Sequence, residues 1–288
     1  MIRSEISNIV EASDDPVLAL QGHEHISCLF ITYNRSDLLV ITYTALRNAI
    51  SRMQLMAEFI VADDNSSLVH QKEISKIGFD TISVARSNAG LGANQNRGLA
   101  LCKGQFFLQI QDDWLFIGDP MDLADAIALL KSDPDIGIVQ LTPVHSDLPF
   151  ERRKIGSHEF VVFKNDGLPW LRNCGVRPYS DCPHIKRFEF VEDLGPYLEG
   201  VPMAVCENDY KRRVARQNRW KVAQLVGSST FKHLGEEVSH NPGGKRHPVI
   251  KAMLSLPVGG KMLERAVRKV YVQLDHAAAV GWSFLRGR

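Results

Sequence analysis

The sequence predicts an α/β protein built on a doubly wound, mainly parallel sheet. From residue 26 to residue 141, short apolar segments rich in β-branched residues alternate with segments whose apolar residues recur at helical spacing. Such alternation is typical of parallel strands joined by right-handed crossover helices. The length of 288 residues, with 44% hydrophobic and 23% charged side chains, suits one large domain of this class.

Strands are expected where apolar residues run together, and helices where they recur every three or four positions. The predicted strands are 26–33, 58–64, 80–86, 105–113, 135–141 and 158–163, with a further strand-like run at 221–235. The predicted helices are 35–53, 67–78, 91–104, 119–134 and 207–220. Ser36 is expected to cap the first helix, and Gly78 to close the second. Residues 178–200 are expected to form loop and short helix.

Composition narrows the classes of function. The net charge of +1 indicates no nucleic-acid partner, because no global field would attract one. The five cysteines include no C-x-x-C pair, which argues against a disulfide framework and a structural zinc site and favours a reducing cytosol. The first twenty residues carry acids and no long apolar core, so we expect no signal peptide. No apolar run is long enough for a membrane helix, and we expect a cytoplasmic protein.

Three polar clusters follow predicted strands, namely "TYNR" at 32–35, "DDNSS" at 63–67 and "QDDW" at 111–114. Ligands of doubly wound sheets bind outside the carboxyl ends of the strands, so these clusters are expected to meet in one crevice. The segment "SNAGLGANQNRGLA" at 87–100 places glycines before a helix, where a backbone approaches a phosphate closely. It matches neither the dinucleotide-binding fingerprint nor the P-loop.

Two adjacent acids, Asp112 and Asp113, end the apolar strand 105–113, although Asp is a poor strand residue. Strand side chains alternate, so Gln111 and Asp113 share one face and Asp112 points away unless the chain turns there. Two neighbouring carboxylates need a cation or separate partners, and a hard divalent ion with oxygen ligands would serve. The alternative is a simple turn in which both acids are solvated.

Four segments together resemble the nucleotide-sugar half of family 2 glycosyltransferases with the GT-A fold. They are "FITYNR", "IVADDNSS", "NAGLGANQNRGL" and "FFLQIQDDW", in this order and spacing. The resemblance covers roughly 26–120, and more loosely 178–235, where "ENDYKRR" and "FKHLG" look like the acceptor half. It implies a GT-A-like doubly wound sheet with an acceptor-binding C-terminal half. With the pattern along the chain, the expected parts are a lead-in segment (1–25), a nucleotide-sugar-binding Rossmann-like half (26–141), an acceptor-binding and catalytic half (142–240) and a basic helical tail (241–288).

The resemblance also implies roles for individual residues. The implied base contact is Asp64 or its neighbour Asp63, and Asp113 with His233 would bind a divalent cation, Mn²⁺ or Mg²⁺. Gln111 stands where the family has the first acid of its D-x-D motif, and Asp112 would support the site or contact the ribose. The implied donor nucleotide-binding set is Thr32, Tyr33, Asn34, Arg35, Asp63, Asp64, Asn88, Gly90, Asn94, Gln111 and Asp112.

The family's catalytic base is an acid at a helix start, and here "CENDYKRRV" offers two. We expect Asp209 to be the base and keep Glu207 second, with Asn208 interrupting the family's E-D pair. The alternative is that these acids only favour the amino end of a helix dipole. The displacement would be in line, with inversion at the anomeric carbon.

The predicted function is transfer of a hexose-type sugar from a nucleotide-diphosphate donor, a UDP-sugar first, to a hydroxyl of a glycan, lipid-linked saccharide or small molecule. The tail 241–288 carries nine Lys and Arg against two acids, so it is either a solvated helix or a peripheral contact with the inner membrane face. One alternative function is a nucleotidyltransferase of similar fold, whose Gly-rich basic signature is missing after the first strand. Another is a non-catalytic sugar-nucleotide or glycan-binding protein, which Gln111 and Asn208 favour.

Overall fold

The computed structural model describes residues 25–53, 55–143, 150–163, 179–227 and 230–235. The strands are β1 (His25–Thr32), β2 (Met56–Asp63), β3 (Thr81–Val84), β4 (Phe106–Gln111), β5 (Trp114–Phe116), β6 (Ile136–Gln140), β7 (Phe150–Ile155), β8 (His158–Phe163), β9 (His184–Arg187), β10 (Lys221–Val226) and β11 (Phe231–His233). The helices are α2 (Ser36–Arg52), α3 (Leu68–Ile77), α4 (Leu91–Leu99), α5 (Pro120–Ser132), α6 (Phe188–Leu194) and α7 (Met203–Arg216).

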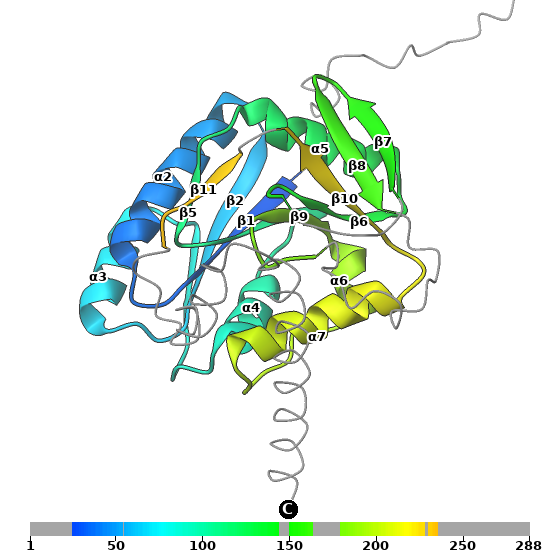
Figure 1. Ribbon diagram of the computed structural model, residues 1–288. Helices are drawn as coiled ribbons and strands as arrows, with labels where there is room; N and C mark the ends of the chain where they lie inside the picture. Colours follow the sequence, from blue (N-terminus) through cyan, green and yellow to red (C-terminus); the bar gives the residue numbers. More distant parts are fainter. Residues whose placement is uncertain (1–24, 54, 144–149, 164–178, 228–229, 236–288) are drawn as a thin grey trace, which may run out of the picture.

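A nine-stranded sheet in the order β3-β2-β1-β4-β9-β6-β10-β8-β7 forms the centre of the protein (Figure 1). Neighbours from β3 to β4 are parallel, and so are β6 and β10. Strand β9 enters antiparallel between β4 and β6, and the β7–β8 hairpin closes the far edge. The predicted doubly wound, mainly parallel α/β fold is confirmed, with the chain order reversing between β1 and β4 at the point where such sheets bind ligands.

Helices cover both faces of the sheet (Figure 1). One face packs its apolar side chains against α2, α3 and α5 in the largest core cluster. The other face packs against α4, α6 and α7 through two smaller clusters. The strands are therefore buried on both sides, as their nearly continuous apolar runs predict. No helix in the described part of the chain is both long and apolar enough to cross a membrane.

Strand β9 corrects the expectation of loop and short helix at 178–200. Its residues "HIKR" are all buried although only Ile185 is apolar. No local pattern predicts such a strand, because its burial depends on hydrogen bonds and aromatic rings contributed by distant parts of the chain. The hairpin strand β7 was also not predicted, since its alternately exposed charged residues "FERRKI" do not form an apolar run.

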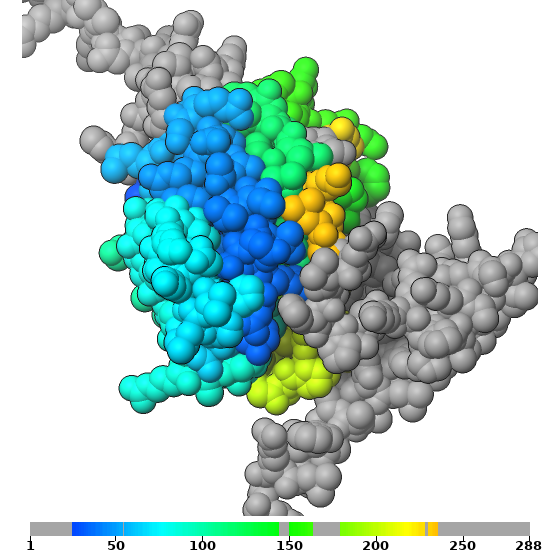
Figure 2. Space-filling view, turned by 90° about the vertical axis from the view of Figure 1, so that its left-hand side faces the viewer, coloured from blue at the N-terminus to red at the C-terminus, as the bar shows by residue number. Residues whose placement is uncertain are grey.

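Other bounds differ from the prediction for local reasons. Strand β4 ends at Gln111, and Asp112 and Asp113 form a turn that leads into β5. The predicted run 221–235 is two strands, and the second, β11, pairs antiparallel with β5 and reaches the surface beside α2 (Figure 2). Ser36 is the first residue of α2 and Arg35 takes the cap position, which corrects the predicted cap. Gly78 closes α3 in the left-handed conformation, as predicted.

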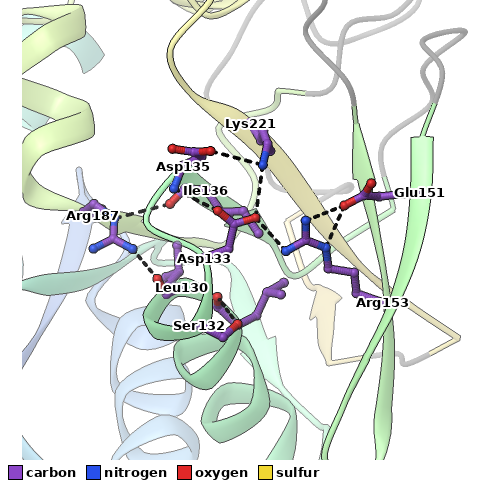
Figure 3. A network of polar contacts seen from close by, with 10 residues as sticks. Leu130, Ser132, Asp133, Asp135, Ile136, Glu151, Arg153, Arg187 and Lys221 are labelled. Carbon is purple, nitrogen blue, oxygen red and sulfur yellow. Dashed lines mark hydrogen bonds and ion pairs between the residues drawn. The ribbon is translucent and has the colours of Figure 1, made fainter.

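The amino ends of β6 and β10 are held together by a network of charged groups (Figure 3). Asp133, at the end of α5, accepts bonds from Arg153 on β7 at 2.6 Å and from Lys221 on β10 at 3.2 Å. Burial opposes its ionisation, but bonds from the backbone N–H of Asp135 and from the Lys221 and Arg153 side chains keep the pKa of Asp133 below its usual value. The amino ends of these two strands are therefore closed by protein contacts.

Most of the predicted lead-in segment, and the whole of the predicted basic tail 241–288, lie outside the described residues.

Candidate functional site

Two carboxylates and one guanidinium meet in the turn after β4. Arg35 Nη1 lies 3.2 Å from Asp112 Oδ1 and 2.6 Å from Asp113 Oδ2. Both carboxylates are only 4% exposed. The turn makes this arrangement possible, because in a continued strand the two acids would point to opposite faces. These three residues are called the carboxylate corner below.

Asp112 joins the corner to the first strand and helix. Its Oδ2 accepts a bond of 2.7 Å from the Thr32 hydroxyl, and its backbone oxygen accepts one of 2.8 Å from Thr42 on α2. Burial and the neighbouring charge of Asp113 raise the pKa of Asp112 to about 7, although Thr32 and Arg35 act in the opposite direction. Both oxygens of its carboxylate accept hydrogen bonds from protein donors.

Asp113 faces His233 on β11. Its Oδ2 lies 3.3 Å from His233 Nε2, and its Oδ1 is buried with no hydrogen-bond partner among the described residues. The backbone N–H of Leu234 donates to the Asp113 carbonyl at 2.7 Å, so β11 is fastened to the turn. A Cβ on Gly235 would lie 2.1 Å from Asp113 Oδ2. Only glycine lets the chain pass this close to the carboxylate.

The corner suits a divalent cation that is held partly by substrate. Within the described residues, no group of three or more His, Cys, Asp or Glu side chains is arranged to hold a metal ion. Asp113 Oδ2 and His233 Nε2 face each other as two possible ligands, and Oδ1 of the same carboxylate is buried without a hydrogen-bond partner among the described residues. Mg²⁺ and similar ions are commonly bound through one or two protein ligands together with substrate phosphates, so the pair fits such an ion.

The cluster after β2 is bound to the cluster after β1, as the predicted crevice requires. Asn34 Oδ1 accepts from the Ser67 N–H at 2.7 Å, and its own N–H donates to the Ser66 hydroxyl at 2.7 Å. The Ser66 hydroxyl donates to Asp63 at 2.5 Å. Burial raises the pKa of the Asp63 carboxyl although Ser66 acts against this. Asp63 is fully buried and therefore does not offer a free edge to a nucleotide base.

Asp64 anchors the glycine-rich segment instead. Its two carboxylate oxygens accept from the backbone N–H groups of Ala89 at 3.0 Å and Gly90 at 2.9 Å. Gly90 has φ of 86°, a conformation that favours glycine, and α4 begins directly after it. The predicted acid and the predicted glycine segment are thus brought together at the edge of the sheet.

The remaining predicted donor-site residues differ in their exposure. Tyr33 and Asn88 are exposed and Gln111 is half-buried at the end of β4. Asn94 is buried, and its amide donates to the Thr32 carbonyl at 3.3 Å and the Ala62 carbonyl at 3.0 Å. It ties the ends of β1 and β2 together, so its predicted place beside the donor is that of a support.

Glu207 lies on the side of α7 that faces the segment before β9. Its Oε1 is 3.4 Å from the Asp181 N–H and 2.9 Å from Lys211 Nζ. The register of β9 pairs His184 with Gln109 of β4 and Gln140 of β6, so the residues before it lie near the carboxyl ends of those strands. Glu207 therefore faces the same edge of the sheet as the carboxylate corner.

Asp209 lies half a turn around the same helix. Its Oδ2 accepts from Arg213 Nε at 2.9 Å, and Arg213 also donates to the carbonyls of Leu194 at 2.6 Å and Gly195 at 3.1 Å. These bonds fasten α7 to the end of α6. Asp209 is thus paired with an arginine that is itself bound to the end of α6, whereas Glu207 is paired with Lys211 and faces the segment before β9.

Sequence reasoning missed one charged group beneath this region, Lys186 on β9. It is fully buried and donates to the Tyr197 hydroxyl at 2.5 Å and to Gln109 Oε1 at 3.2 Å. The rings of Tyr197 and Tyr210 stack 4.3 Å apart, with the Lys186 nitrogen 4.9 and 5.0 Å from their centroids. Burial lowers the pKa of Lys186 to about 7, opposed by Asp181. No sequence signal marks it, because its partners come from four separate segments.

Comparison with known proteins places these features in a family. The sequence profile described as Glycosyl transferase family 2 matches residues 27–194. No curated protein sequence matches the chain.

Solved structures share the fold at low sequence identity. The mannosyltransferase PcManGT from Pyrobaculum calidifontis, in complex with GDP-Man and Mn²⁺, is 15% identical with a TM-score of 0.50, covering 74% of this chain and 56% of that one. TarS 1-349 of S. aureus, in complex with UDP-GlcNAc, is 16% identical with a TM-score of 0.54, covering 83% of this chain and 69% of that one. This chain thus spans just over half of the mannosyltransferase, and the likeness shows a shared fold.

Proposed function

Because the chain belongs to glycosyl transferase family 2, we propose that it transfers a hexose-type sugar from a nucleotide-diphosphate donor to an acceptor hydroxyl with inversion. The carboxylate corner is the observation that carries the proposal, since its buried acids lie at the switch point of the sheet with His233 beside them. Two proteins of the same fold bind GDP-Man with Mn²⁺ and UDP-GlcNAc, respectively. A UDP-sugar is the first donor to test, with GDP-sugars second.

Asp113 and His233 would hold the divalent cation in this proposal. When bound, such a cation offsets the negative charge that develops on the leaving diphosphate. Asp112 keeps the turn in place through Thr32 and Thr42.

The chemical step is a single displacement. The acceptor oxygen bonds to the anomeric carbon while the bond from that carbon to the phosphate oxygen breaks, and the electron pair leaves with the nucleoside diphosphate. The acceptor proton passes to a carboxylate acting as general base. We place Glu207 ahead of Asp209 in this role. Both acids pair with a base four residues on, but the partner of Asp209 is itself fixed to α6, and Glu207 faces the segment before β9.

The acceptor is proposed to be a hydroxyl of a glycan, a lipid-linked saccharide or a small molecule. Membrane contact through residues 241–288 stays a prediction. A basic tail would bring the protein to an anionic surface on which lipid-linked acceptors are displayed.

A screen of nucleotide sugars tests the proposal. We expect at least one UDP- or GDP-sugar to raise the melting temperature in the presence of Mn²⁺, and the same donor to be hydrolysed slowly with water as acceptor. Asp113→Ala is expected to abolish the hydrolysis. Asp135→Ala is the matched control, because it removes the same charge at the opposite edge of the sheet.

Two other outcomes would contradict the proposal. A melting shift without turnover of the bound donor, with any acceptor supplied, would indicate a sugar-nucleotide-binding protein. No shift with any nucleotide sugar would exclude the proposed donor class altogether.

A further inference from the structure

Arg35 supplies the positive charge of the carboxylate corner. It sits at the cap position of α2, in the loop that leaves β1, and its side chain is 13% exposed. One nitrogen, Nη1, reaches both carboxylates, at 2.6 Å from Asp113 and 3.2 Å from Asp112. Two adjacent acids of this burial would repel each other strongly without it.

The guanidinium competes with a metal ion for one oxygen atom. Asp113 Oδ2 accepts the shorter bond from Arg35 and also faces His233 Nε2 at 3.3 Å. A cation shared by Asp113 and His233 would be drawn to this same oxygen. A divalent ion and a guanidinium on one oxygen would repel each other, so binding of the first requires the second to withdraw.

We propose that Arg35 is an exchangeable counter-ion, which neutralises the carboxylate corner in the free protein and moves to the donor diphosphate when the divalent cation binds. A guanidinium pairs with phosphate as readily as with carboxylate, so the side chain keeps an anionic partner in both states. Its position at the amino end of α2 suits this transfer, because that end of a helix favours an anion. The second half of the proposal rests on the proposed function.

An exchangeable Arg35 and a fixed salt bridge differ in how they affect metal binding. If Arg35 must withdraw, the free protein binds the metal weakly, and the nucleotide strengthens metal binding by giving Arg35 another partner. The two ligands are then coupled, and each raises the affinity of the other by the same factor. If the salt bridge of Arg35 only held the loop in place, its removal would lower the stability of the protein and leave its metal affinity unchanged.

Binding of Mn²⁺ alone tests the first half. The electron paramagnetic resonance signal of free aqueous Mn²⁺ reports the bound fraction without any assay of activity. We expect Arg35→Gln to bind Mn²⁺ about tenfold more tightly than the wild type in the absence of nucleotide. Arg47→Gln is the matched control, because it removes the same charge from the same helix at a residue that contacts Tyr43. It should bind Mn²⁺ like the wild type.

A second variant guards against misfolding of Arg35→Gln. Arg35→Lys keeps the charge but replaces the planar guanidinium with a compact ammonium. Its Mn²⁺ affinity should therefore lie between those of the wild type and Arg35→Gln. Asp113→Asn should remove Mn²⁺ binding in every background. Equal or weaker Mn²⁺ binding by both Arg35 variants would overturn the proposal.

Adding UDP or GDP tests the second half. The nucleotide should strengthen Mn²⁺ binding by the wild type, and this gain should be largely lost in Arg35→Gln. An undiminished gain in the variant would overturn the transfer to the diphosphate. If neither nucleotide affects the wild type, the proposed donor class fails together with the transfer, while the measurement with Mn²⁺ alone still decides whether Arg35 is exchangeable.

Discussion

Two neighbouring strands each carry buried charge, and the charge is balanced differently in each. After β4, the carboxylate corner balances two acids with the guanidinium of Arg35. On β9, which pairs with β4, Lys186 is held by a hydroxyl, an amide and aromatic faces. The first group lies at the edge of the sheet, and the second is closed off beneath α4 and α7.

This difference indicates which of the two charged groups can exchange its partners for a ligand. Under the proposed exchange, acids balanced by a side chain at the edge of the sheet can pass that side chain to an incoming phosphate. A lysine fixed by dipoles and rings has no vacant partner to offer, and its burial lowers its pKa to about 7. We therefore expect changes in the corner to affect binding, and changes around Lys186 to affect folding.

Asp113→Asn provides the largest test of this contrast. It should lower donor turnover about 10³-fold, because a neutral amide is a poor ligand for a divalent ion. The melting temperature should change little, since the substitution also removes one of two adjacent negative charges. Enzyme assays and thermal melts of Asp113→Asn and Asp135→Asn check this. A large loss of stability would instead show that the carboxylate corner serves folding, as Lys186 and its partners do.

Separate substitution of the two candidate bases on α7 extends the comparison. Glu207→Gln should lower turnover about 10²-fold, a typical loss for a general base. Asp209→Asn should change turnover only a few-fold and lower the stability, because it releases Arg213 from its place between α7 and α6. Turnover and unfolding of both variants are measured side by side. The reverse pattern of turnover would return the role of base to Asp209.

The sequence predicted the β1–β4 part of the fold well, for a physical reason. There, each buried element carries its own periodicity, and each strand is followed by polar residues where it leaves the sheet. The elements β1, α2, β2 and α3 consequently lie within two residues of their predicted bounds. Strand β9 has no such pattern, because Lys186 is stabilised by groups that are close only after folding.

The same limit applies to the site. Asp112, Asp113 and Arg35 were recognisable from residue type and strand end, but their bridge depends on a turn that strand alternation did not predict. Likewise, the bonds from Asp64 to the N–H groups of Ala89 and Gly90 link segments that are separate in sequence. Residue identity marked these side chains as candidates, and only the fold shows which partners each of them has.

The buried amine gives a smaller effect with a definite sign in pH. Burial lowers the pKa of Lys186 to about 7 in the folded protein, against an unfolded value near 10.4. Between these values the unfolded chain binds the extra proton, so the free energy of unfolding rises with pH. From pH 7 to 9 the wild type should gain about 2 kcal/mol relative to Lys186→Met, measured by urea denaturation.

Lys221→Met is the control for this titration. Partial burial lowers the pKa of Lys221, but bonds to Asp133 and Asp135 outweigh this and raise it above its usual value. The stabilisation from the charged Lys221 is fully present below its usual pKa. The difference in unfolding free energy between Lys221→Met and the wild type should therefore stay constant from pH 7 to 9. A constant difference for Lys186→Met as well would show that its amine stays charged, and the contrast with the corner would weaken.

The smallest test compares two glycines, one in each kind of environment. A Cβ on Gly235 would lie 2.1 Å from Asp113 Oδ2, whereas a Cβ on Gly98 would lie 2.6 Å from the Leu29 side chain in the core beneath α4. Gly235→Ala should weaken nucleotide-dependent Mn²⁺ binding about fivefold with little loss of stability, because the carboxylate must shift. Gly98→Ala should leave Mn²⁺ affinity unchanged and lower the stability, because a packed core resists added volume. Titrations of Mn²⁺ with nucleotide and urea denaturation of both variants separate these effects. Both glycine variants could instead lose stability and keep their metal affinity. The chain at Gly235 would then pack against the carboxylate corner like part of the core. Such rigid packing would contradict an exchangeable Arg35.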